Sequence, residues 1–384
     1  MPPCASANRQ APLSDAIRRV NRLHDRAVAC RAQGRYERAA SLGRQSLRKL
    51  ECAVGPDHPD VANVLNTLVA IHADLGAYAE AELLAQRSVA IMAQAHGDVD
   101  IERIRVQSIG ALASLYRMQG RYAEAEPLYQ QACVIATQAL GPDDLDLATT
   151  LNNLAVLYKY QGHFASAQRL YRRALAITTK ALGPEAPEVA TLYHNLGGLE
   201  HARGRYRRGE PLARRAVAIR EQALGSDHPA VAADIAALAA ILDGQGKFGE
   251  SVPLYHRALA IFEATFGPEH YEIAVNLNNL AAIAYEQGDV AQAKHLYLKA
   301  LQIKEHILGG DHVDVATTLY NLAVLDHHQG HHEAAQARYR RALTIYEETL
   351  DSAHPHILDC RRQYEDSLRT MGRNEVTPDH EAHP

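Results

Sequence analysis

The chain has 384 residues, of which 47% are hydrophobic and only 6% aromatic, with no Trp. This length is too great for one ordinary compact core, so two or three domains or a repeat array are expected, and the composition favours helices over a β-sandwich. A net charge of −5 and the lack of a long apolar run predict no nucleic-acid partner and no membrane partner.

The N-terminal segment, residues 1–13, is polar and contains proline, and we predict a disordered tail there. It lacks the charged start and apolar stretch of a signal peptide. The five cysteines are scattered without C-x-x-C spacing, a pattern typical of reduced thiols. We therefore expect a cytoplasmic protein with a structured array over residues 14–372 and a second disordered tail over 373–384.

Glycines recur through the array with one period. They stand 42 residues apart, except for one interval of 44, and we call them the turn glycines. They are Gly34, Gly76, Gly120, Gly162, Gly204, Gly246, Gly288, Gly330 and Gly372. The two extra residues fall between Gly97 and Gly120, in the loop or first helix of the third unit. A fixed period over the whole chain predicts a repeat architecture.

Each unit has the pattern of a helix–turn–helix. A Leu stands eight residues before most turn glycines, as in Leu154, and a small residue such as Ala155 follows it. An aromatic residue usually comes two residues after the turn glycine, and small residues then recur at helical spacing. Large side chains beside small ones allow neighbouring helices to interdigitate. Connectors such as "LGPDD" end the second helix with Gly and Pro.

The turn sequence "QGxYxxA" and the small–large pattern resemble tetratricopeptide repeats, and the 42-residue period with "LNNLAVLY" and "YRRALAI" is similar to the kinesin light chain type. The resemblance implies an all-α, right-handed superhelical solenoid of about eight helix–turn–helix units. The last segment, "HPHILDCRRQYEDSLRTMG", has a first helix but no second, so we expect a C-terminal capping helix.

The resemblance also implies that the first helix of each unit lines a concave groove in which partner peptides lie. Positions ten, nine and three residues before a turn glycine fall on the exposed side of that helix. The candidate peptide-binding residues there are Asn66, Arg117, Asn152, Asn153, Lys159, His194, Asn195, His201, Asn278, Asn279, Tyr285, Tyr320 and Asn321. An Asn offers two donors and an acceptor, which match an extended peptide backbone. Alternatively, these Asn side chains bond to the backbone of a neighbouring helix or face water.

Charged side chains suggest two further roles. In the kinesin light chain family similar grooves bind acidic peptides, and the resemblance implies that Arg117, Lys159, Arg172 and Arg173 could supply positive charge; alternatively, such arginines form a solvated face. The sequence "DHHQGHHEAA" places four histidines within six positions. Because this is a repeat turn rather than a designed ligand set, we expect no metal site there.

The sequence contains no G-x-x-x-x-G-K-[ST] and no G-x-S-x-G motif. We therefore expect no enzyme and no cofactor, and we interpret the chain as an adaptor that binds an extended peptide segment of a partner protein. Two alternatives stay open: a regulator that senses a ligand or peptide, and a self-assembling scaffold that forms a homo-oligomer.

Overall fold

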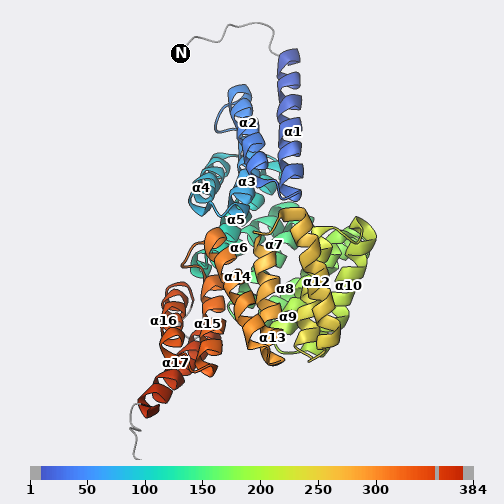
Figure 1. The fold of residues 1–384 in the computed structure, drawn as a ribbon. Coiled ribbons are helices and arrows are strands. Elements are labelled where there is room, and N and C mark those ends of the chain that lie inside the picture. The colour runs from blue at the N-terminus through green and yellow to red at the C-terminus, as the bar shows by residue number, and fades with distance from the viewer. Residues whose placement is uncertain (1–9, 351–353, 375–384) are drawn as a thin grey trace, which may run out of the picture. The chain divides into compact units, whose positions relative to one another are not determined.

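The computed structural model describes residues 10–350 and 354–374 (Figure 1). The first helices of successive pairs are α1 (Gln10–Ala32), α3 (Pro59–Asp74), α5 (Val99–Met118), α7 (Leu145–Tyr160), α9 (Pro187–Ala202), α11 (Pro229–Asp243), α13 (Tyr271–Glu286) and α15 (Val313–His328). The second helices are α2 (Tyr36–Val54), α4 (Tyr78–Gln94), α6 (Tyr122–Ile135), α8 (Phe164–Leu182), α10 (Tyr206–Leu224), α12 (Phe248–Phe266), α14 (Val290–Leu308) and α16 (His332–Thr349). A π-helical segment, Ala136–Leu140, extends α6, and α17 (Pro355–Asn374) follows the last pair.

The all-α repeat fold predicted from the sequence is confirmed. Within the described residues there are eight helix pairs, a final single helix and no strand. The right-handed sense of the superhelix stays a prediction. Residues 1–9 and 375–384, which hold most of the two predicted tails, lie outside the described residues, as do 351–353. The helices begin before residue 14 and end after residue 372.

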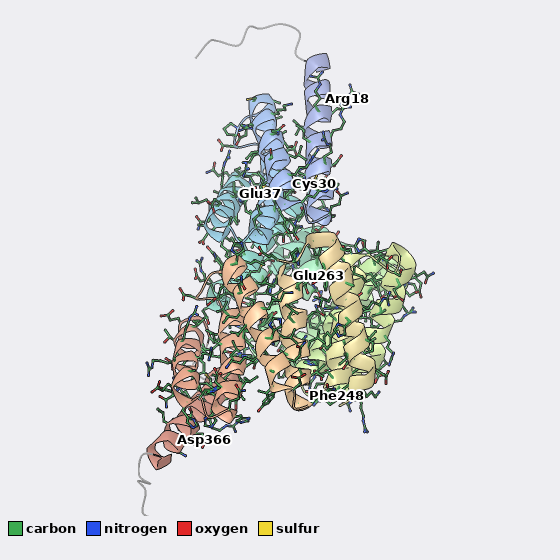
Figure 2. All side chains as sticks on the ribbon, in the orientation of Figure 1. Arg18, Cys30, Glu37, Phe248, Glu263 and Asp366 are labelled. Carbon is green, nitrogen blue, oxygen red and sulfur yellow. The ribbon has the colours of Figure 1, made fainter. Side chains whose placement is uncertain are left out.

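The described chain divides into two compact units. The first unit contains residues 10–158 and 165–192, and the second contains 159–164, 193–350 and 354–374. Within each unit, consecutive helices pack on one another, as α3 does on α4 and α13 on α14. Side chains fill the space between the helices, as Figure 2 shows around Cys30, which packs with Ala39 and Ile71.

The turn glycines set the sharp reversal inside each pair. From Gly34 to Gly330 their φ angles lie between 65° and 83°, a left-handed region that favours glycine. Gly372 differs, because it lies within α17. The Leu predicted eight residues before each turn glycine is buried in every unit from Leu68 to Leu322.

The third pair accommodates its two extra residues in its first helix. Helix α5 has 20 residues, whereas α3 and α7 each have 16. The Asp98 carboxylate accepts hydrogen bonds from the backbone N–H groups of Asp100 and Ile101 at 3.1 and 3.4 Å. This cap allows the helix to begin early, because it satisfies donors that a helix start leaves unpaired.

Histidines begin several of the other first helices. In His58, His228, His270 and His312 the ring Nδ1 accepts a hydrogen bond from the backbone N–H two residues later, at 3.1–3.3 Å. Each of these rings therefore acts as an N-cap, and the connectors that the sequence predicted to lead into the next helix do so through histidine.

Cysteines Cys30, Cys52, Cys133 and Cys360 carry free thiols, and Cys4 lies outside the described residues. Burial raises the pKa of the Cys133 thiol to about 11, which disfavours the reactive thiolate there. None of the described helices combines the length and the apolar character that crossing a membrane requires.

Candidate functional site

The predicted peptide-binding residues all lie on first helices and share one degree of burial. Each side chain is partly exposed, neither buried in the core nor free on the surface. Asn66, Arg117, Asn152 and Asn153 belong to the first unit, and the others belong to the second. The structure therefore describes two separate sets of candidates, and their hydrogen bonds decide which polar groups remain available to a ligand.

In the first unit, hydroxyl groups of neighbouring helices hold Asn66 of α3. Its amide nitrogen donates to Ser108 Oγ of α5 at 3.0 Å, and its carbonyl oxygen lies 2.7 Å from Ser88 Oγ of α4. Ser88 and Ser108 are fully buried. Asn66 thus takes the alternative role of bonding to neighbouring helices, through their side chains rather than their backbone.

The Asn pair of α7 is bonded differently. Asn152 donates from Nδ2 to Asn153 Oδ1 at 3.2 Å, whereas Asn153 Nδ2 makes no hydrogen bond to any residue that the structure describes. The nearby second-helix tyrosine, Tyr129, is fully buried, and its hydroxyl lies 2.8 Å from Ser114 Oγ. Asn153 therefore keeps both of its donors at a partly exposed position.

Two cations, Arg117 and Lys159, stand three residues before their turn glycines. The Nε of Arg117 is buried and makes no hydrogen bond within the described residues. The Lys159 ammonium, which belongs to the second unit, lies 5.1 Å from the centre of the Tyr160 ring. His201 belongs to the same unit, and burial lowers its pKa, with a further decrease caused by the positive charge of Lys159.

In the second unit, His194 belongs to a buried ionic network. Its Nδ1 lies 2.8 Å from Asp234 Oδ1, and Arg220 Nε donates to Asp234 Oδ2 at 2.6 Å. Only 1% of Asp234 is exposed, so the arginine supplies the charge that a buried carboxylate requires. His194 is therefore held by the core, while its neighbour Asn195 is partly exposed.

In the Asn pair of α13, Asn278 is bonded to a neighbouring helix and Asn279 lies near a buried tyrosine. Asn278 Oδ1 accepts a hydrogen bond from Thr318 Oγ1 at 3.2 Å, and Thr318 Oγ1 accepts one from Lys304 Nζ at 3.0 Å. Burial lowers the pKa of Lys304. Asn279 lies close to Tyr255, where its amide opposes part of the rise in pKa that burial imposes on the tyrosine. The Tyr255 hydroxyl makes no hydrogen bond within the described residues.

The remaining candidates occupy the C-terminal pairs. Tyr285 contacts His328 through its hydroxyl, and Tyr320 donates its hydroxyl proton to Asp359 of α17. Burial raises the pKa of Tyr285 and of Tyr320, and the bond to Asp359 raises the pKa of Tyr320 further. Asn321 makes no hydrogen bond to any described residue, so its amide is available to a ligand.

Sequence reasoning missed a second polar position, twelve residues before the turn glycine. The buried polar residues at this position are Ser108, Thr150, Asp234, Asn276 and Thr318. It also missed Asp326, which is fully buried and forms ion pairs with Arg338 and with Lys294, the latter at 2.9 Å. The repeat register holds a signal for both, because polar residues recur at these positions among apolar ones.

The four clustered histidines lie at the last interhelical turn and make separate contacts. The rings of His327 and His332 are tilted at 59° to each other with centres 5.4 Å apart, and His331 Nδ1 lies 3.8 Å from Asp326 Oδ1. Burial lowers the pKa of His327, and the neighbouring His332 and His328 lower it further. Among the residues that the structure describes, no three His, Cys, Asp or Glu side chains are placed to hold a metal ion.

Solved structures with similar folds include a protein with tetratricopeptide-like repeats and two Rap proteins. A putative kinesin light chain from Podosopora anserina is 27% identical over 54% of this chain and 98% of its own, with a TM-score of 0.44. A Rap protein complexed with competence and sporulation factor is 15% identical over 88% of this chain and 99% of its own, with a TM-score of 0.61. The Rap conjugation gene regulator of plasmid pLS20, in complex with a peptide, is 14% identical over 76% and 75%, with a TM-score of 0.60.

The tetratricopeptide-repeat profile matches residues 19–94, 103–180, 188–264, 232–305 and 272–348, and a second profile of the same description matches 152–223. These segments extend over most of the array, in the same register as the turn glycines. The chain belongs to the tetratricopeptide repeat family.

Proposed function

We propose that the chain is an adaptor whose first helices bind an extended peptide segment of a partner protein. Tetratricopeptide-repeat arrays are interaction scaffolds, and the helices of this chain form such an array. Two proteins of the same fold, the Rap protein and the plasmid regulator, were solved with bound factors, one of them a peptide. The fold likeness supports an interaction role, and the hydrogen-bond pattern of this chain supports the particular residues.

The observation that carries the proposal is the unused amide of Asn153. Its Nδ2 has no partner among the described residues, although the side chain is only partly exposed and lies on a well-packed helix. Asn321 repeats this arrangement in the second unit. A half-buried amide that bonds to no protein group can pair with the backbone of an extended peptide, which supplies alternating donors and acceptors.

These amides also bear on selectivity. Because backbone groups are common to all peptides, Asn153 and Asn321 would contribute affinity with little preference for peptide side chains. Selectivity would then come from the neighbouring side chains, such as the partly buried cation Arg117. Asn66 and Asn278, which are already bonded to serine or threonine hydroxyls, would contribute less to binding.

The test uses peptides selected from a random phage-displayed library against the full chain. Their affinity is then measured for Asn153→Glu and Asn321→Glu. A carboxylate repels peptide carbonyl groups, so we expect at least one variant to weaken binding about tenfold or more. Circular dichroism shows whether each variant keeps its helix content.

Matched controls are Gln131→Glu on α6 and Gln302→Glu on α14. Both glutamines are exposed on second helices and make no hydrogen bond to a described residue, and each substitution adds the same charge. We expect the controls to bind within about twofold of wild type. The proposal fails if the library yields no binding peptide, or if control and test variants lose affinity equally.

A further inference from the structure

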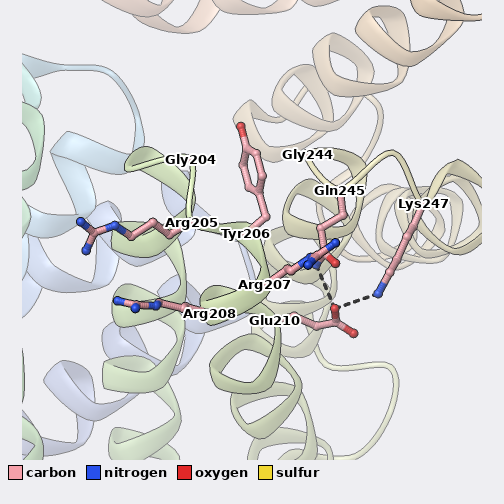
Figure 3. Close-up of a pocket in the computed structure, with 9 residues that line it drawn as sticks. All are labelled: Gly204, Arg205, Tyr206, Arg207, Arg208, Glu210, Gly244, Gln245 and Lys247. Carbon is pink, nitrogen blue, oxygen red and sulfur yellow. Dashed lines mark hydrogen bonds and ion pairs between the residues drawn. The ribbon is translucent and has the colours of Figure 1, made fainter.

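A cavity of about 780 Å³ opens at two consecutive interhelical turns of the second unit (Figure 3). One wall comes from the turn between α9 and α10, and the other from the turn between α11 and α12. None of the predicted peptide-binding residues lines it. We call this cavity the turn-edge pocket. Ligand binding in it does not depend on the peptide binding proposed for the first helices.

A glycine shapes one wall of the pocket. A Cβ atom on Gly244 would lie 2.4 Å from Cε1 of the Tyr206 ring, closer than any real side chain approaches. The opposite contact of that ring is His201, whose ring centre lies 5.3 Å away in an edge-on arrangement. The position two residues before the turn glycine is Gly only in this pair of the array. Gly244 thus lets the Tyr206 ring pack against the next turn.

The charge in the pocket is strongly positive. Three exposed arginines, Arg205, Arg207 and Arg208, form no ion pair with any described residue. The one acidic group, Glu210, is already neutralised, because it accepts hydrogen bonds from Lys247 at 2.9 Å and Gln245 at 2.9 Å. Arg214 pairs with the same carboxylate at 2.8 Å. These contacts hold the pKa of Glu210 at about 2.

The third turn shows how an arginine at the same position can be compensated. Arg121 stands one residue after its turn glycine, as Arg205 does, and pairs with Glu124 at 2.7 Å and Glu82 at 2.8 Å. The residue that corresponds to Glu124 is Arg208. The fifth turn therefore places like charges three residues apart in the first turn of α10, where the helix dipole favours anions.

We propose that the turn-edge pocket binds an acidic segment of a partner protein, with two or more carboxylates spaced along an extended chain. Each carboxylate would pair with one or two of the three uncompensated guanidinium groups, whose planar geometry suits carboxylate recognition. Binding would relieve the repulsion among them, and the Tyr206 ring would pack against the apolar part of the segment.

The arrangement of the arginines favours an extended chain over a single small anion. In Figure 3, Arg205 and Arg208 extend to the same side, away from Glu210, whereas Arg207 points toward Gln245 on the other side. One phosphate ion cannot contact all three groups in this arrangement. The pocket also offers a single tyrosine, and a nucleic acid would need several stacking platforms and a longer basic path.

The test measures binding of fluorescein-labelled hexaglutamate to the full chain by anisotropy at low salt. The variant Arg205→Gln/Arg207→Gln/Arg208→Gln removes the uncompensated charges. The control Arg38→Gln/Arg48→Gln/Arg340→Gln removes three exposed arginines that lie outside the pocket and form no ion pair with a described residue. We expect about tenfold weaker binding in the pocket variant and less than about twofold in the control. Equal losses in both would overturn the proposal, since net charge alone would then explain binding.

Two further binding measurements test whether the pocket prefers another class of ligand. Inorganic phosphate at about 10 mM should not displace hexaglutamate beyond its ionic-strength effect; full displacement would contradict an extended ligand. A single-stranded oligonucleotide of equal charge should bind more weakly than hexaglutamate, and tighter binding that depends on the three arginines would also contradict the proposal.

The variant Gly244→Ala keeps every charge but pushes the Tyr206 ring. The backbone of Gly244 has φ −59° and ψ −13°, which alanine adopts freely, so the helix end itself is not strained. We expect hexaglutamate to bind severalfold more weakly to this variant with unchanged helix content. Unaltered binding would show that the cavity does not contribute and that the arginines act as an unstructured patch.

Discussion

The sequence "LNNL" occurs twice at the same place in the repeat, over 151–154 in α7 and over 277–280 in α13. The asparagines of the two copies have different contacts. In α7 the two asparagines bond to each other, and Asn153 keeps its donors. In α13 Asn278 bonds to Thr318, and Asn279 faces a buried tyrosine hydroxyl. Identical motifs in identical register therefore leave different groups available to a ligand.

Residues far away in sequence cause the difference. The tyrosine 24 residues before each second asparagine is Tyr129 in one case and Tyr255 in the other. Ser114 bonds to the Tyr129 hydroxyl, whereas the equivalent position near Tyr255 is Ala240, which has no hydroxyl. Forty residues after Asn278 stands Thr318, but forty residues after Asn152 stands Leu192. A site in this array is thus defined by the neighbours that leave its polar atoms unbonded.

The largest expected effect concerns two threonines at one repeat position, Thr318 and Thr150. Both hydroxyls donate to the carbonyl four residues earlier, Thr150 to Asp146 O at 2.8 Å and Thr318 to Asp314 O at 3.2 Å, but only Thr318 also bonds to Asn278 and Lys304. Thr318→Val removes an acceptor from a buried ammonium group and should cost about 2–3 kcal/mol, whereas Thr150→Val should cost less than about 1 kcal/mol. Urea unfolding of both variants measures the difference, and equal costs would remove the basis of the comparison.

The next largest effect is expected when the serine partner of Tyr129 is removed, because the surroundings of Asn153 in α7 then resemble those of Asn279 in α13. Ser114→Ala leaves the buried Tyr129 hydroxyl without its partner and should lower the free energy of unfolding by about 1–2 kcal/mol. Asn153 is then drawn toward that hydroxyl, so affinity for a selected peptide should fall severalfold. In Ser114→Ala/Tyr129→Phe, which removes the unsatisfied hydroxyl, both stability and affinity should recover. Unchanged affinity in the single variant would show that Tyr129 does not compete for Asn153.

A smaller effect is expected in the opposite direction. Ala240→Ser offers the Tyr255 hydroxyl the partner it lacks, at a partly exposed position that corresponds to Ser114. One added hydrogen bond should stabilise the protein by about 0.5–1 kcal/mol. Thermal unfolding followed by circular dichroism would detect this increase, and a decrease would show that the serine does not reach Tyr255.

The smallest effect is a pH dependence from Lys304. Burial lowers its pKa in the folded chain below the ordinary value of 10.5, so the unfolded chain binds more protons between the two values. The free energy of unfolding therefore rises as pH increases between the folded and the unfolded pKa of Lys304. The substitution Lys304→Met should remove this rise. The measurement is the difference between the two unfolding curves at each pH, which cancels the tyrosines common to both. A parallel pair of curves would mean that Lys304 is not desolvated.

The fold was predictable because its signals repeat. The turn glycines, the Leu eight residues before them and the small residues beside it are local patterns, and the structure confirms them from Leu68 to Leu322. The placement of the third unit's extra residues in α5 depended on the cap formed by Asp98, which the spacing of glycines did not reveal.

The availability of each candidate side chain was harder to predict. Every candidate lies on the expected helices, but Asn66 bonds to Ser108 and His194 to Asp234, partners about forty residues away. Comparison of each position with its counterpart one period later could have suggested these bonds. Whether a hydroxyl turns toward an asparagine or toward its own helix, as Thr150 does, depends on packing that a sequence pattern does not contain.

The most direct test of the account compares Asn153→Ala with Asn278→Ala, using a peptide selected on the wild-type chain. Both variants remove one amide from an LNNL motif without adding charge or bulk, and Asn278 is bonded to Thr318 whereas Asn153 keeps its donors. We predict that Asn153→Ala weakens peptide binding about fivefold or more, while Asn278→Ala stays within about twofold. If Asn278→Ala loses affinity and Asn153→Ala does not, unbonded amides do not mark the peptide-binding positions.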